Sequence, residues 1–67
     1  MKISLRQQIE EIDRELEQRS RVYPRLVSSG GMRQSIADYQ VARLQAARDT
    51  LAWLFEHEAL IKQRLAM

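Results

Sequence analysis

The glycine pair Gly30-Gly31 constrains this chain most, because these are its only glycines and they lie between two long helical patterns. Glycine takes a positive φ at little cost, so two in succession let the backbone reverse its direction. We therefore predict an all-α fold in which two helices form an antiparallel hairpin. The expected bounds are about 3–28 for the first helix, 29–32 for the turn and about 34–65 for the second helix.

The first helix carries an apolar seam at steps of four, three and four residues. This spacing keeps one face of a helix against a partner helix. The seam consists of Leu5, Ile9, Ile12 and Leu16. Arg19 interrupts it, and Tyr23 and Leu26 continue its register.

Two residues bear on the ends of the first helix. Ser4 is a suitable N-cap, because its hydroxyl can accept a hydrogen bond from a free backbone N–H of the first turn. Pro24 disfavours the α conformation at Tyr23, so the helix either stops near Val22 or kinks near Pro24. We favour the kink, because Leu26 and Val27 are apolar and in register.

The second helix has more apolar surface than one partner helix needs. Its main seam consists of Ala37, Val41 (or Gln40), Leu44, Ala47, Leu51, Leu54, Glu58, Ile61 and Leu65. A second stripe, roughly 50–100° round the helix, consists of Ile36, Tyr39, Ala46, Trp53 and Leu60, with Phe55 on the far flank. Ser35 and Asp38 have the spacing of a capping box at the start of this helix.

A chain of 67 residues without cysteine has few means of stabilising itself alone. A wide apolar face on so small a domain implies another helix from another chain. We therefore expect a homodimer, in a four-helix arrangement, with the second helix supplying most of the interface. The expected interface residues are Leu44, Leu51, Trp53, Leu54, Leu60 and Ile61.

The charge of the chain is uneven, although the net charge is only +2. Residues 18–37 contain four arginines and no acidic residue, so the end of the hairpin is expected to be basic. Such a surface attracts phosphates or acidic protein surfaces; alternatively, it is a solvated cluster near a helix C-terminus. The candidate partner-binding residues are Arg19, Arg21, Tyr23, Arg25, Arg33, Tyr39 and Trp53.

The sequence offers little for catalysis. His57 is the only histidine, and its neighbours Glu56 and Glu58 point to different helix faces, so the three side chains do not converge. We expect no enzyme activity, no metal, no cofactor and no small-molecule substrate. We also expect no membrane span, because no apolar run is long enough, and we expect a cytoplasmic location in a bacterial host cell.

The central part of the chain, roughly residues 19–51, contains a recognisable pattern. Its residues are Arg21, Val22, Tyr23, Pro24, Val27, Gly30 (or Gly31), Met32, Ala37, Asp38, Thr50 and Leu51. The pattern resembles R-x-V-Y-P-x-x-V-x-x-G-x-M, which is found in small helical proteins of temperate bacteriophages and prophages, mostly of unknown function. Arg33 stands where that pattern usually has Ser or Thr. The resemblance implies an accessory phage protein that binds and modulates a host protein, such as a transcription regulator or a defence complex.

The leading hypothesis is therefore a non-enzymatic phage protein that homodimerises and binds a bacterial host protein. An alternative is an accessory nucleic-acid-binding protein of phage replication or recombination, acting through the basic end of the hairpin. A third possibility is a coiled-coil component of a larger phage assembly.

Overall fold

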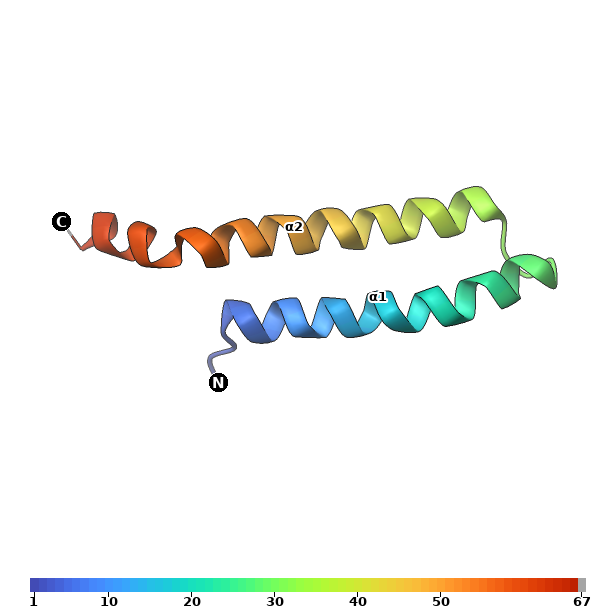
Figure 1. Cartoon of the computed structure of the whole chain (residues 1–67), viewed down its shortest axis with the longest axis horizontal. Helices are drawn as coiled ribbons and strands as arrows, with labels where there is room; N and C mark the ends of the chain where they lie inside the picture. Colours follow the sequence, from blue (N-terminus) through green and yellow to red (C-terminus); the bar gives the residue numbers. More distant parts are fainter. Residues whose placement is uncertain (67) are drawn as a thin grey trace.

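The computed structural model describes residues 1–66, which form two antiparallel helices, α1 (Leu5–Ser28) and α2 (Gln34–Leu65) (Figure 1). No strand occurs among these residues, which confirms the all-α class. The hairpin measures 56 × 22 × 16 Å and has a radius of gyration of 16.1 Å. A compact domain of this length would have a radius of about 11 Å. The fold is therefore a rod, with little room for a core.

The N-terminus of α1 is capped as the sequence predicts. The Ser4 hydroxyl accepts a hydrogen bond from the Gln7 backbone N–H at 3.1 Å, and the Gln7 side chain accepts one from the Ser4 N–H at 2.9 Å. This reciprocal pair is a capping box, which satisfies two backbone donors that the helix leaves free. Because the cap lies at Ser4, the helix begins at Leu5.

Pro24 does not end α1, which continues to Ser28. The last turns of the helix lean toward α2 in Figure 1. They end in a Schellman motif, in which the Gly31 N–H donates to the Leu26 carbonyl at 2.9 Å and the Gly30 N–H donates to the Val27 carbonyl at 3.1 Å. Gly30 has a φ of +81°, the left-handed conformation that this motif requires.

Only the first glycine of the pair needs its conformational freedom, and this difference is testable. Gly30→Ala is expected to lower the free energy of unfolding by about 1–2 kcal/mol, because a side chain in the left-handed region is strained. Gly31→Ala is the matched control, since its Cβ would lie 3.6 Å from the Leu26 Cδ2 atom, an ordinary contact. Urea unfolding followed by circular dichroism, at one protein concentration, compares the two. Equal stability of both variants would refute the role given to Gly30.

The N-cap of α2 differs from the predicted one. The N-cap is Arg33, whose φ of −79° and ψ of 142° are extended, and its side chain makes no capping hydrogen bond. Ser35 is already inside the helix, so the predicted Ser35–Asp38 capping box does not form. Asp38 instead accepts a hydrogen bond from the Gln34 side chain at 2.8 Å.

The two helices meet along the predicted seams, but they bury little. Tyr23 and Ala37 are the only buried side chains among the described residues, at 9% and 3% exposure. The half-buried seam residues are Leu5, Ile9, Ile12, Leu16 and Arg19 of α1, and Val41, Leu44, Leu51, Leu54, Glu58 and Ile61 of α2. Leu26 and Leu65, also expected in the seams, are exposed.

Ala47 is another seam position of α2 that was predicted wrongly. Ala47 is exposed, and Arg48 takes its place between the helices. The Arg48 guanidinium reaches across to the Asp13 carboxylate, and this is the one salt bridge between α1 and α2 in residues 1–66. The side chain of arginine is long enough to span the gap, which the methyl group of alanine cannot fill. The hydrogen bond between the Arg48 guanidinium and the Asp13 carboxylate also raises the pKa of Arg48 above its usual value.

Candidate functional site

The most exposed apolar surface of the hairpin is the second stripe of α2, here called the back stripe: Ile36, Tyr39, Ala46, Trp53 and Leu60. Its four large side chains are 47–56% exposed, and Ala46 is exposed as well. None of the five lies in the seam with α1. The structure therefore leaves an apolar line open to solvent along most of α2.

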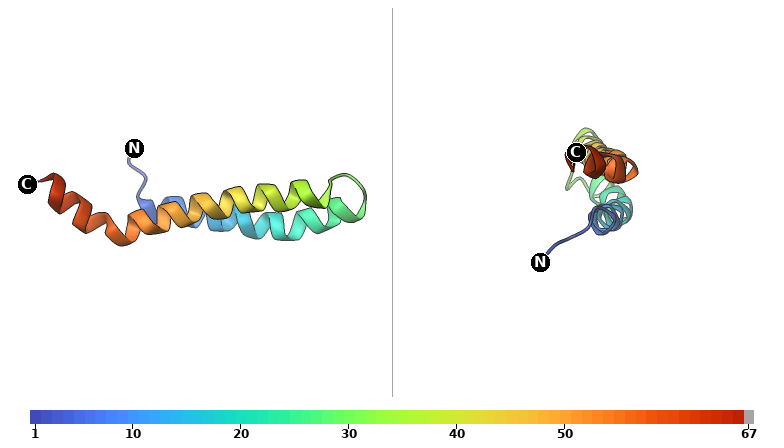
Figure 2. Two further views of the ribbon diagram at one scale, coloured as in Figure 1. Left: turned by 90° about the horizontal axis from the view of Figure 1, so that it is seen from above. Right: turned by 90° about the vertical axis from the view of Figure 1, so that its left-hand side faces the viewer.

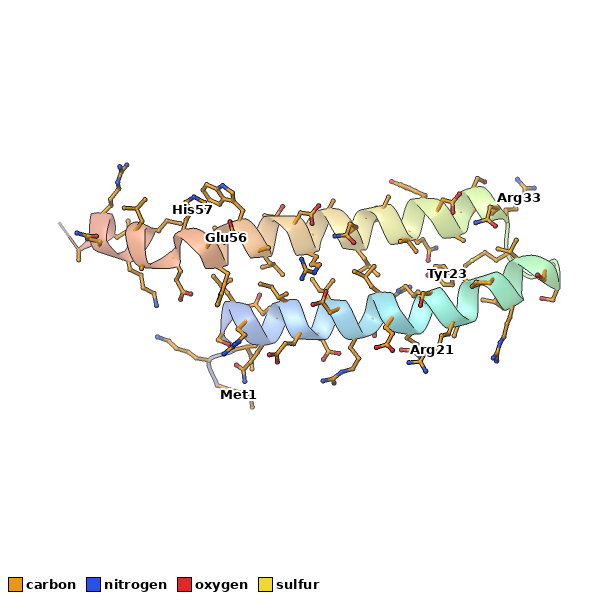
Figure 3. The ribbon with its side chains drawn as sticks, in the orientation of Figure 1. Met1, Arg21, Tyr23, Arg33, Glu56 and His57 are labelled. Carbon is orange, nitrogen blue, oxygen red and sulfur yellow. The ribbon has the colours of Figure 1, made fainter. Side chains whose placement is uncertain are left out.

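Both aromatic rings of the back stripe rest on a residue one turn further along α2. The Arg43 guanidinium lies 5.5 Å from the centre of the Tyr39 ring. The Trp53 and His57 rings are stacked, with centroids 4.3 Å apart. His57 is held in this position by Nδ1, which lies 2.7 Å from the Trp53 carbonyl oxygen, on the side of α2 away from α1 (Figure 3). Each of these interactions comes from within α2 itself.

Two candidate partner-binding residues, Arg19 and Tyr23, lie between the helices rather than on the surface. The Tyr23 hydroxyl donates to the Gln40 side-chain oxygen at 2.6 Å and accepts a hydrogen bond from Arg19, which also binds Glu15. The hydrogen bond to Tyr23 is the main reason that the pKa of Arg19 is raised. The Nε atom of Arg19 is buried and has no hydrogen-bond partner among the described residues. Tyr23 is therefore a structural residue of the seam, and its ring is unavailable for stacking on a ligand.

The remaining arginines near the turn are exposed but point in different directions. Arg21 pairs with Glu17 at 3.3 Å and points away from α2, whereas Arg33 projects at the start of α2 (Figure 3). Within residues 1–66, neither Arg25 nor Arg33 makes a salt bridge. We call these three arginines, together with the exposed side chains of Val22 and Leu26, the tip surface. The sequence did not assign Val22 or Leu26 to the surface. Leu26 was expected in the seam, because it continues the heptad register.

The predicted dimer-interface residues divide into two groups. Trp53 and Leu60 belong to the exposed back stripe. The other four are half-buried against α1, and they are Leu44, Leu51, Leu54 and Ile61. Glu58, a position of the predicted seam, binds Lys62 of its own helix at 2.9 Å, near the place where α2 extends past the start of α1 (Figures 1 and 2).

The comparisons with known proteins supply no relative. The chain matches no protein-family model, no curated protein and no solved structure. Within residues 1–66, no three metal-ligating side chains are grouped, and neither helix combines the length and the apolar composition of a membrane span. The function proposed below therefore rests on the two surfaces just described.

Proposed function

We propose that this chain is a non-enzymatic protein of a temperate phage or prophage that forms a homodimer and binds a bacterial host protein in the cytoplasm, modulating its activity. The supporting observation is how little of the hairpin is buried: in residues 1–66, two side chains are buried, whereas ten large apolar side chains are exposed. A chain whose apolar residues mostly face solvent gains stability from association with another protein. The phage origin rests on the pattern in residues 19–51.

The solvent-exposed area of the hairpin supports a second copy of the chain as one of its binding partners. A folded monomer of 7.9 kDa is expected to expose about 4,400 Å², whereas the hairpin exposes 5733 Å². The excess is about 1,300 Å² per chain and about 2,600 Å² for a pair, within the range of about 2,000–5,000 Å² that stable homodimers bury.

The tip surface is the proposed contact with the host protein. It combines two unpaired arginines with two exposed apolar side chains, Val22 and Leu26. Arginine beside apolar side chains suits a protein surface that is acidic around an apolar centre. The burial of Tyr23 speaks against the nucleic-acid alternative, because base stacking on an exposed aromatic ring was part of that hypothesis.

Affinity purification from a nuclease-treated bacterial lysate, at two salt concentrations, tests this contact. The test variant combines Arg25→Glu with Arg33→Glu, and the control combines Lys2→Glu with Arg64→Glu at the other end of the rod. Each pair of substitutions lowers the net charge by 4, from +2 to −2. The tip variant is expected to lose at least about 10-fold of the captured host protein, since each lost charge-assisted contact costs about 1.5–3 kcal/mol, while the control retains it.

Two outcomes would overturn the proposal. One is equal capture of the same host protein by both variants, which would place the contact outside the tip surface. The other is recovery of nucleic acid alone, lost at the higher salt concentration, which is the behaviour of a phosphate-binding protein.

A further inference from the structure

We propose that the back stripe is covered by a second copy of the chain that runs antiparallel to the first, with Ala46 at the two-fold axis. Tyr39 then packs against Trp53 of the partner subunit, and each Leu60 lies level with Met32 of the partner subunit. This arrangement rests on the homodimer proposed above and specifies its geometry.

The spacing of the back stripe is that of a helix–helix seam. Tyr39, Ala46, Trp53 and Leu60 are seven residues apart, and Ile36, Arg43, Thr50 and His57 fall between them at steps of three and four. Such a line of residues faces a partner helix along its whole length when the two helices wind slightly around each other. The smallest member, Ala46, lies midway between the two aromatic residues. At that position, two helices approach closely while each aromatic ring fits beside the ring of the other chain.

Charge favours the antiparallel orientation. In a parallel pair, the two tips would lie side by side, bringing together the arginines of both chains from a segment without acidic residues. Like charges at such short range oppose association. In the antiparallel pair the tips are at opposite ends, and Arg33 lies one residue from the level of Glu58 of the partner subunit. The exposed ends of the rod thus meet opposite charge rather than like charge.

Charge also selects the register. An antiparallel pair centred at the midpoint of α2, between Asp49 and Thr50, would bring the two Asp49 residues within one residue of the same level. Centring on Ala46 instead places Asp49 level with Arg43 of the partner subunit, because the numbers of level residues then add to 92. The aromatic pair forms only in the second register.

The antiparallel dimer carries its two tip surfaces at opposite ends. Arg33 is thirteen residues from Ala46, so the two Arg33 residues are separated by about 39 Å along the rod at 1.5 Å per residue. One dimer therefore presents two tips that face in opposite directions and bind two copies of a host protein.

A spin-label distance measurement tests the arrangement. The chain has no cysteine, so Gln34→Cys introduces a single labelling site per chain. Gln34 is exposed and lies about 140° round α2 from Tyr39, outside the proposed interface. Pulsed dipolar spectroscopy on the labelled full chain is expected to give a distance of about 36 Å, from twelve residues on each side of Ala46. The mass of the same sample is measured by light scattering.

The other outcomes separate this inference from the homodimer itself. A distance of about 46 Å would mean that the pair is centred on the middle of α2, and one below about 20 Å would mean a parallel pair, since packed helices are about 8–10 Å apart. Either result, with a dimeric mass, overturns the arrangement but leaves the homodimer intact. A monomeric mass without dipolar coupling overturns both.

Discussion

Replacing Ala46 by glutamate is expected to weaken self-association by at least about 100-fold. In the proposed dimer the two new carboxylates face each other at the symmetry axis, and like charges in direct contact cost several kcal/mol. The larger side chain also keeps the helices apart. Analytical ultracentrifugation over a range of protein concentrations measures the dissociation constant of the variant against that of the original chain.

Ala59→Glu is the matched control for this experiment. Ala59 is also an exposed alanine of α2, but it lies outside the back stripe, so the same substitution adds the same charge without entering the interface. It is expected to change the dissociation constant by less than about 3-fold, as surface substitutions usually do. If the two variants dissociate to the same extent, the back stripe is not the dimer interface.

Replacing Tyr23 by alanine is expected to lower the free energy of unfolding by about 3 kcal/mol or more. Tyr23 is the largest buried side chain among the described residues, and removing a buried aromatic ring costs about 3–5 kcal/mol. The change also leaves Gln40 and Arg19 without their shared hydrogen-bond partner. Because a domain of this size has a small margin of stability, most of its cooperative unfolding transition should be lost.

Two further variants separate the ring from its hydroxyl. Tyr23→Phe keeps the packing but removes both hydrogen bonds, so we expect an intermediate loss of about 1–3 kcal/mol. Val22→Ala, at an exposed neighbouring position, should cost less than about 0.5 kcal/mol. Urea unfolding followed by circular dichroism ranks the three variants. A Tyr23→Ala variant as stable as Val22→Ala would contradict the central place of Tyr23 in the seam.

Much of the fold follows from local sequence signals. The two glycines and the helical periodicity on either side predict the hairpin, and Gly30 does adopt the required positive φ. Ser4 caps α1 because the residue three positions later is a glutamine. The exposed back stripe was likewise visible as a second line of apolar residues that one partner helix would leave uncovered.

The wrong assignment of Ala47 to the seam concerns how the two helices align. Once the turn is centred near residue 31, residues whose numbers add to about 62 lie level across the hairpin, as Tyr23 and Gln40 do. Asp13 and Arg48 obey the same rule, so the long side chain of Arg48 reaches a carboxylate at its own level. Periodicity within one helix does not contain this information, because it depends on both helices at once.

The tip was the least predictable part of the candidate site. Sequence proximity suggested that Arg19, Arg21, Tyr23, Arg25 and Arg33 act together. Successive residues on a helix point about 100° apart, so neighbours in sequence leave the helix on different sides. Arg19 and Tyr23 are one helical turn apart and both point into the seam, whereas Arg21 points outward.

The mass of the unmodified chain in solution tests the central claim most directly. Sedimentation equilibrium at micromolar concentration is expected to give 15.8 kDa, twice the chain mass of 7.9 kDa. A mass of 7.9 kDa that does not change with concentration would contradict the account, because the back stripe would then remain exposed to solvent. A series of larger masses would also contradict it, in favour of a component of an extended coiled-coil assembly.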